Sequence, residues 1–179
     1  MSTCAALAEN NIGYLQQSVA LLERIDDATY TRGNPATFSS GFGPHLRHCL
    51  DHYERFLDGL PTHRIDYDAR DRDPRTETDR LIALERIRAI IAGLRRIAPS
   101  QRDTPVEIKM DCGDETKTES WWTRSTVSRE LQFLVSHTVH HYALIAFILR
   151  THGIDTGSEF GVAPSTLRYQ KSLATPCAP

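Results

Sequence analysis

The sequence predicts an all-α protein, a four-helix bundle with a small β-hairpin between the third and fourth helices and a C-terminal tail. Four segments carry apolar residues at helical spacing, and a stretch before the last of them has two short alternating runs around a Gly-Asp turn. The chain has 179 residues, of which 40% are hydrophobic and 25% charged. That length suits one packed core, so we expect residues 1–179 to form a single domain. Amphipathic helices in so small a chain typically pack as a bundle.

Turn residues delimit the first two helices. Helical spacing runs from about Thr3 to Asp27, where the polar sequence TYTRGNP ends the pattern. The second segment, SSGFGPHLRHCLDHYERFLDGLP, offers Ser39 or Ser40 as its N-cap and Gly59 as its end.

The third and fourth helices have similar signals. Thr76 or Thr78 is expected to start the segment ETDRLIALERIRAIIAGLRRIAP, which has one apolar stripe. Ser128 is expected to cap a helix that runs to about His152, with Gly153 placed for a C-terminal stop. The tail DTGSEFGVAPSTLRYQKSLATPCAP has no long period, so we expect it to wrap across the bundle or to be partly disordered.

Composition excludes several classes of protein. The net charge is −2, and no basic cluster suggests a nucleic-acid or membrane surface. No stretch approaches 18 apolar residues, and the start MSTCAALAENN lacks the pattern of a signal peptide. The cysteines are scattered without a CxxC pair, which is typical of reduced thiols in a cytoplasmic protein.

Three histidines lie in the apolar sequence VSHTVHHYALIAFILR of the fourth helix. At about 100° per residue, His137 and His141 face the core one turn apart, whereas His140 lies at the rim of the apolar stripe. Imidazoles four residues apart on a helix can bind one metal ion. Thr138 stands where a zinc protease of the HExxH type needs glutamate, so that class is excluded. A pair of buried core histidines without a metal is the alternative.

The second helix carries three more histidines. His45, His48 and His52 lie within about 60° of one another, and the apolar stripe is centred more than about 90° from His48. Periodicity therefore favours His45 or His52 as the inward residue. A solvated polar face is one interpretation. The other is that the two helices face each other and form a three-nitrogen metal site with positions open to water or substrate.

These motifs resemble those of the DinB-like superfamily of metal-binding four-helix bundles. In the family, a histidine in the second helix is commonly followed three residues later by an acidic residue, as His48 and Asp51 are in HLRHCLD. The HxxxH motif of the fourth helix matches His137 and His141. The sequences GPHLRHCLDHYERF and IDYDARDRD are also similar to stretches in DinB-like proteins, and the resemblance covers most of the chain in architecture.

The resemblance implies a divalent ion, most often zinc or nickel, held by His48, His137 and His141. The apolar periodicity of the second helix does not favour His48 as the inward residue. His52 and His45 are therefore kept as alternative ligands to His48. The better-known relatives, bacillithiol-dependent S-transferases and a mycothiol-dependent maleylpyruvate isomerase, use thiol cofactors. The resemblance thus implies a metal-dependent enzyme, a low-molecular-weight-thiol-dependent S-transferase or a hydrolase, acting on a small molecule. The alternative is a non-catalytic metal-binding or structural bundle, and a homodimer is compatible with either.

Other residues near these motifs have two interpretations each. Asp51 either orients an imidazole or is a surface carboxylate. Glu130 shares the face of His137, where it would serve as a fourth ligand or a base, or it is an ordinary glutamate of a first helical turn. Cys49 falls in the core stripe, about 100° from His48, and is not expected to bind metal.

Arginines and tryptophans near the site are also ambiguous. Arg70 and Arg72 either bind a carboxylate or phosphate of the ligand or pair with the aspartates of their own loop. Trp121 and Trp122 either line the mouth of the pocket or cover an end of the bundle. Adjacent strand residues point to opposite faces, so at most one tryptophan is expected to reach the site.

Overall fold

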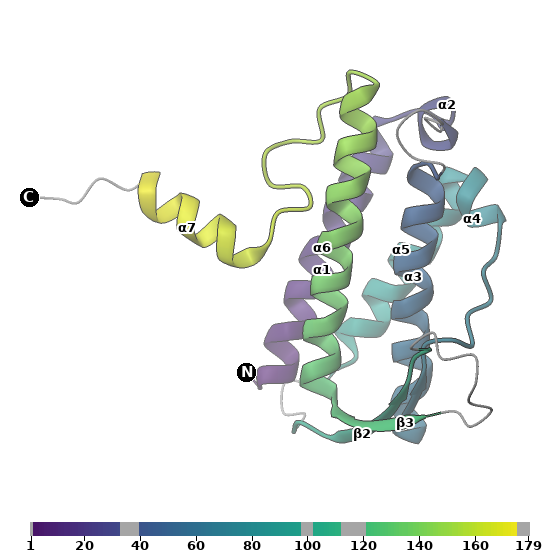
Figure 1. Ribbon diagram of the computed structural model, residues 1–179, viewed down its shortest axis with the longest axis vertical. Coiled ribbons are helices and arrows are strands. Elements are labelled where there is room, and N and C mark those ends of the chain that lie inside the picture. Colours follow the sequence, from purple (N-terminus) through teal and green to yellow (C-terminus); the bar gives the residue numbers. More distant parts are fainter. Residues whose placement is uncertain (1, 33–39, 98–101, 112–120, 175–179) are drawn as a thin grey trace, which may run out of the picture.

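Four long helices and a small sheet at one end of them make up the computed structural model, which describes residues 2–32, 40–97, 102–111 and 121–174 (Figure 1). The long helices are α1 (Thr3–Arg24), α3 (Phe42–Gly59), α5 (Arg80–Arg95) and α6 (Val127–Thr151). The shorter elements between and after them are α2 (Asp27–Thr31), the 3-10 helix η1 (Leu60–Thr62), α4 (Arg75–Thr78) and α7 (Pro164–Ala174). The all-α four-helix fold predicted from the sequence is confirmed.

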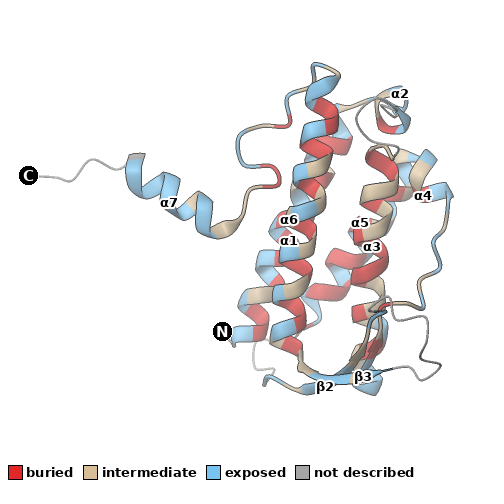
Figure 2. Ribbon diagram, in the orientation of Figure 1, coloured by how far each residue is buried: buried red, intermediate tan, exposed pale blue. Residues whose placement is uncertain are grey.

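The core lies between the four long helices. Helix α1 packs against α5 and α6, and α3 packs against the same two helices. Figure 2 shows their buried residues turned toward the centre of the bundle. By length and apolar composition α6 would also suit a membrane span, but it packs in this core, as the central helix of a bundle does. Its fully buried side chains include Leu131, Leu134, Tyr142, Ile145 and Ile148.

The helices begin at caps that differ from those expected. Gly41 is the N-cap of α3 and makes no side-chain cap bond, while Ser40 instead contacts His45. Ser39 lies outside the described residues. Thr126, and not Ser128, caps α6, because the hydroxyl of Ser128 is bonded to a neighbouring aspartate.

The third long helix begins later than expected. Asp79 caps α5 by accepting hydrogen bonds from two backbone N–H groups of its first turn, a common role for a short carboxylate. Thr76 and Thr78 therefore belong to the separate short helix α4. Gly153 follows α6 with a positive φ of 75°, which confirms the expected stop.

A three-stranded sheet closes one end of the bundle (Figure 1). The expected hairpin is confirmed: β2 (Pro105–Lys109) and β3 (Trp122–Thr126) pair antiparallel, with Lys109 opposite Trp122. The turn between them lies outside the described residues. A third strand, β1 (Arg64–Asp66), pairs parallel to β2 and was not predicted. Its sequence RID is too short to show an alternating pattern.

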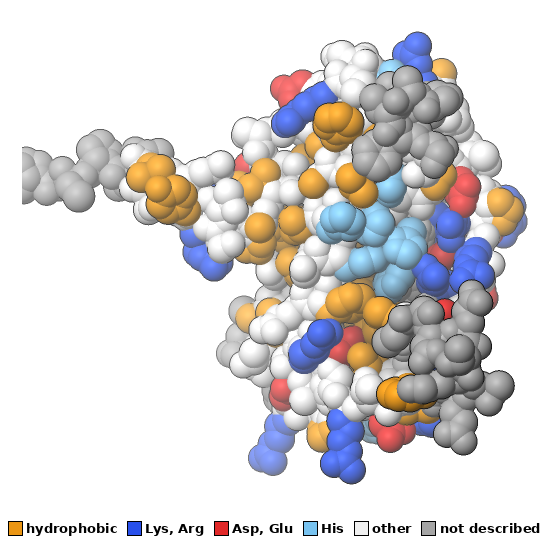
Figure 3. Space-filling view, in the orientation of Figure 1, with side chains coloured by type: hydrophobic (Ala, Val, Ile, Leu, Met, Phe, Trp, Pro, Cys, Tyr) orange, Lys and Arg blue, Asp and Glu red, His pale blue; other side chains and the backbone are white. Residues whose placement is uncertain are grey.

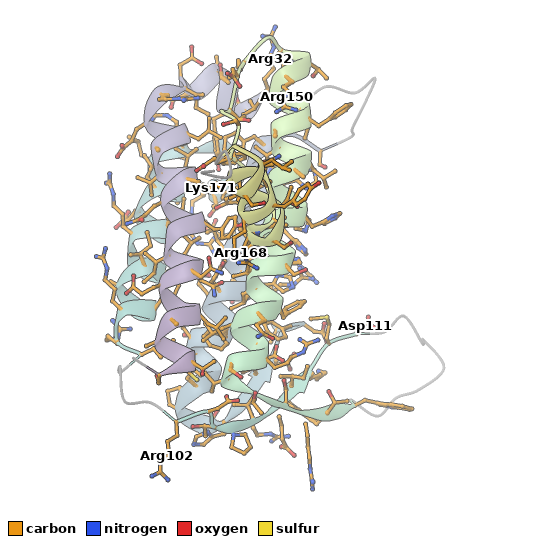
Figure 4. The ribbon with its side chains drawn as sticks, turned by 90° about the vertical axis from the view of Figure 1, so that its left-hand side faces the viewer. Arg32, Arg102, Asp111, Arg150, Arg168 and Lys171 are labelled. Atoms are coloured by element: carbon orange, nitrogen blue, oxygen red, sulfur yellow. The ribbon has the colours of Figure 1, made fainter. Side chains whose placement is uncertain are left out.

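The segment after α6 departs most from expectation. Phe160 stacks on Tyr142 of α6 with ring centroids 4.7 Å apart, so the chain first returns to the bundle. Helix α7 then projects away from it, with Tyr169 and Leu173 exposed (Figure 1). The expected return across the bundle is therefore seen at Phe160, whereas the helix α7 was not predicted. Figure 4 shows Arg168 and Lys171 on this helix and other basic side chains pointing outward at the two ends of the bundle.

A buried polar network joins three of the long helices. The Tyr53 hydroxyl donates to Asn11 Oδ1 at 2.8 Å and also contacts Thr138 Oγ1 at 3.0 Å. The Asn11 amide in turn donates to the carbonyl oxygen of Leu131 at 3.0 Å. Because buried polar groups are costly without partners, these bonds favour one alignment of α1, α3 and α6.

Replacing Gly43 with alanine is expected to lower the free energy of unfolding by about 2 kcal/mol or more. A Cβ atom there would lie 2.0 Å from the Glu77 carbonyl oxygen, so α3 and α4 would have to separate. Gly13→Ala in α1 is the matched control, since a Cβ there meets nothing within 4 Å. The control should gain about 0.5–1 kcal/mol, because alanine is the better helix former. Urea denaturation measures the free energy of unfolding of both variants. Equal effects would contradict the close approach of α4 to α3 at Gly43.

Candidate metal site

Six histidines gather on one side of the bundle where α3 and α6 lie next to each other. Figure 3 shows them as one pale blue patch at the surface. Their exposure differs: His52 is buried, His140 is exposed, and the others are half-buried. The half-buried members are His45, His48, His137 and His141. His140 is thus the outermost histidine of α6, as expected, while His137 and His141 are half-buried in this surface cluster and do not face the core.

Three of these histidines form the tightest group. His48, His52 and His137 each offer a nitrogen, and the three nitrogens lie within 4.8 Å of one another. The Nε2 atoms of His48 and His137 are 3.0 Å apart. Nitrogens that share one ion at about 2.0–2.1 Å each lie roughly 3 Å apart, so this separation suits a shared ligand pair.

His141 borders this group and has a partner of its own. Its ring centroid is 4.6 Å from those of both His48 and His137. Its Nδ1, however, lies 3.1 Å from Nδ1 of His45, whose Nε2 contacts the Ser40 hydroxyl at 3.0 Å. The structure thus brings all three expected ligands together, and His52 lies closer to His137 than His141 does.

Hydrogen bonds within the group leave ring nitrogens for a metal. The Nδ1 of His52 donates to the carbonyl oxygen of His48 at 2.8 Å, which leaves Nε2 of His52 with its lone pair. Metal-binding histidines commonly donate their other N–H to a backbone carbonyl in this way. The Nδ1 of His137 is buried without a hydrogen-bond partner. These residues therefore fit a divalent ion.

Burial keeps the imidazoles neutral. Burial, followed by the charges of neighbouring groups, lowers the pKa of His137 to about 2, that of His48 to about 3 and that of His141 to about 4. Burial also lowers the pKa of His45 and His52. A metal needs the neutral ring as its ligand, so the cluster is prepared for metal binding at neutral pH.

Acid is expected to destabilise the chelator-treated protein in a window set by these histidines. The unfolded chain takes up protons below the ordinary pKa of 6.5, whereas the folded cluster does not until its pKa values of about 4 to 2. The free energy of unfolding therefore falls as the pH drops from about 6.5 toward 4. Melting temperatures at several pH values measure this fall. A His48→Ala, His137→Ala double variant should show a shallower fall. An equal fall would contradict the assignment of this pH dependence to the clustered histidines.

Arg70 reaches the cluster, whereas Arg72 does not. The Arg70 Nη1 donates to Nδ1 of His48 at 2.7 Å, and Arg72 is exposed with a φ of 51°. The aspartates of the loop pair with other arginines: Asp73 binds Arg75 at 2.8 Å, and Asp71 lies 3.9 Å from Arg55. The alternative of pairing within the loop is thus wrong for Arg70.

Asp51 is neither an exposed carboxylate nor a partner of an imidazole. It is only 2% exposed and accepts hydrogen bonds from Arg47 at 2.8 Å and from Arg86 at 3.0 Å. Arg86 also binds Glu54 on the same face of α3. Asp51 therefore ties α3 to α5 and keeps this face of the helix fixed behind the histidines.

Glu130 is fully buried below the cluster. It accepts hydrogen bonds from the Tyr67 hydroxyl at 2.9 Å and from the Ser125 hydroxyl at 2.5 Å. The Tyr67 ring stacks on His52, with centroids 5.5 Å apart and planes at 26°. Glu130 thus reaches the site through Tyr67. The importance of Tyr67 was missed, although it stands three residues before Arg70 in the quoted IDYDARDRD sequence.

The tryptophans and Cys49, the remaining candidate residues, are not part of the histidine cluster. Trp122 packs under the guanidinium of Arg64, 4.1 Å from the ring centroid, and Trp121 is 59% exposed. Trp122 therefore packs on the sheet at the end of the bundle, whereas Trp121 is exposed. Cys49 is 1% exposed in the core, where burial raises the pKa of its thiol. Phe133, also missed, packs one turn before His137 with ring centroids 5.6 Å apart.

Comparisons with known proteins agree with the resemblance. The model of the DinB superfamily matches residues 15–145, which are most of the chain. FK506-binding protein 5 of Rhizopus delemar is 36% identical over 107 residues, which are 60% of this chain and only 28% of that protein. No solved structure matches. Together with the four-helix fold and the histidines of α3 and α6, the family match shows that the chain belongs to the DinB superfamily.

Proposed function

We propose that this protein is a divalent-metal-dependent enzyme whose ion, zinc or nickel, is held by His48, His137 and His141. The observation that carries the proposal is the gathering of neutral imidazoles from two helices into one half-buried cluster. Ligands on rigid, packed helices hold their positions, and the open side admits water or substrate.

Two histidines, His52 and His141, are candidates for the third metal ligand in this proposal. His52 has a nitrogen within 4.8 Å of those of His48 and His137, so distance favours it. The ring centroid of His141 lies 4.6 Å from those of His48 and His137, and His141 is half-buried, so it borders the surface that a substrate approaches. The family resemblance also supports His141. We therefore assign His141 as ligand and keep His52 as its alternative.

The family resemblance supports thiol chemistry on a small molecule, and the residues around the ligands are compatible with it. A bound divalent ion lowers the pKa of a coordinated thiol or water and so supplies a nucleophile at neutral pH. Tyr67 and Phe133 contact His52 and each other and form an aromatic wall beside the cluster. The wall shields the imidazoles from water on one side, and Arg70 lies on another. Of the two reaction classes, we favour a low-molecular-weight-thiol S-transferase over a hydrolase.

Metal analysis followed by a thiol-transfer assay tests this proposal. Protein purified without a histidine tag should contain about one equivalent of zinc or nickel per chain, or acquire it on reconstitution. The loaded protein should then speed the reaction of a low-molecular-weight thiol with monochlorobimane, which fluoresces when it binds sulfur. No bound metal after reconstitution would overturn the proposal.

A non-catalytic metal-binding bundle is the second candidate, and it predicts a different pair of results. One equivalent of metal without transfer or hydrolysis of any tested substrate would favour it. A large loss of melting temperature on metal removal would also favour it, because a structural ion contributes to folding. A homodimer formed through the helices remains a prediction for either candidate, and sedimentation velocity measures it.

A further inference from the structure

Arg70 occupies one nitrogen of a proposed metal ligand. Its Nη1 donates to Nδ1 of His48 at 2.7 Å, while its Nε is buried without a hydrogen-bond partner. A guanidinium is always charged and offers only donors. The Nδ1 of His48 therefore acts as the acceptor in this contact.

The segment that carries Arg70 is fixed by hydrogen bonds. Asp66 Oδ1 accepts from the backbone N–H groups of Asp68 at 3.0 Å and Ala69 at 3.3 Å. The Arg55 side chain donates to the Ala69 carbonyl oxygen at 2.9 Å. These bonds place the Cα atom of Arg70 beside the cluster and leave its long side chain as the part that can move.

The contact with Arg70 decides which nitrogen of His48 carries the ring hydrogen. With Nδ1 accepting from Arg70, the hydrogen lies on Nε2, which faces Nε2 of His137 at 3.0 Å. A neutral imidazole that offers Nε2 to a metal carries its hydrogen on Nδ1. That hydrogen would point at the N–H of Arg70, and two donors cannot bond to each other. The guanidinium and a divalent ion therefore compete for His48.

We propose that Arg70 and the divalent ion alternate at His48, and that the displaced guanidinium binds an oxyanion of the substrate, a carboxylate or a phosphate, beside the ion. The inference rests on the proposed metal site. A guanidinium fork binds such groups through two parallel hydrogen bonds. The nearby Asp71 and Asp73 already lie against Arg55 and Arg75, so an incoming oxyanion meets an arginine whose loop carboxylates are in use.

This alternation links two ligands thermodynamically. An oxyanion that holds Arg70 away from His48 favours metal binding, and bound metal favours the oxyanion by the same factor. The substrate class that follows is a small anionic molecule, and the metal is bound more tightly when that molecule is present.

Nickel titration of three untagged proteins tests the inference: the parent, Arg70→Gln and Arg72→Gln. Arg72 is exposed two residues along the same loop, so its variant matches the change in charge without touching His48. Without added oxyanion, Arg70→Gln should bind nickel about 10-fold more tightly than the parent, since a hydrogen bond from a charged donor no longer competes. Arg72→Gln should stay within about 2-fold of the parent. Arg70→Lys, which keeps the charge but loses the fork, should fall between.

Titrations with acetate or methyl phosphate at constant ionic strength complete the test. Either oxyanion should tighten nickel binding by the parent about 5-fold or more, but not binding by Arg70→Gln. A larger effect of acetate indicates a carboxylate substrate, and a larger effect of methyl phosphate indicates a phosphate. Nickel binding that is equal or weaker in Arg70→Gln overturns the role of Arg70 alone. No nickel binding by any of the proteins overturns the proposed metal site as well.

Discussion

Replacing His48 and His137 together with alanine is expected to weaken zinc or nickel binding by at least about 100-fold, since even an outer partner of a metal ligand is typically worth 10–100-fold. The two Nε2 atoms lie 3.0 Å apart and come from different helices, so either ligand set of the proposed site needs both rings. Elemental analysis and isothermal titration of untagged protein measure the loss. The variant should remain folded, because both rings are only half-buried.

His140→Ala is the matched control for this prediction. It removes an imidazole from the same helix, but His140 is exposed and borders the group only through His141. Its metal affinity should equal that of the parent. A double variant that binds metal as well as His140→Ala would show that the ion, if one binds, is held elsewhere.

Single variants at His141 and His52 then decide the third ligand. His141→Ala should lower the affinity more than His52→Ala does, if the family ligand set applies here. The opposite order would assign the ion to the tighter group of His48, His52 and His137. Both variants keep the two central rings, so the comparison reports on the third position alone.

Asp51→Ala should have the largest effect on stability, a loss of about 3 kcal/mol or more in the free energy of unfolding, because it removes the buried carboxylate that two largely buried arginines share and the charged hydrogen bonds from both. The Asp51 side chain is 1% exposed, and those of Arg47 and Arg86 are 16% and 15% exposed. Asp58→Ala is the control on the same helix: its carboxylate also binds an arginine, but it is 64% exposed. The control should lose no more than about 1 kcal/mol. Similar urea-denaturation midpoints for both variants would contradict the buried ion pairs.

The long helices could be predicted from the sequence, but several of their starts could not. Apolar spacing identifies a helix over many residues, and each of the four segments has it. A cap depends on which nearby side chain reaches the first N–H groups. Thr126 and Ser128 are equally suited by type, and only the contact of Ser128 with Asp103 separates them.

The site was partly predictable for the same physical reason. The spacing of His137 and His141 on α6 is a local property, so their shared face followed from helix geometry alone. The rotation of α3 against α6 is not local. It turns His48 toward His137 although the apolar stripe of α3 suggested another residue. The reach of Arg70 across a loop, and the burial of Asp51 between two arginines, likewise depend on tertiary contacts.

The buried bonds of Tyr53 have a consequence for how this protein can change. Tyr53 follows His52 directly and Thr138 follows His137 directly, so the interior bond between α3 and α6 lies beside the outward-facing imidazoles. The relative position of the two helices is thus set from inside, independently of the histidines of the cluster. The outward positions can then be exchanged, by evolution or by design, for carboxylates or other ligands while the scaffold stays in register. The bundle separates the part that must be conserved from the part that can acquire new chemistry.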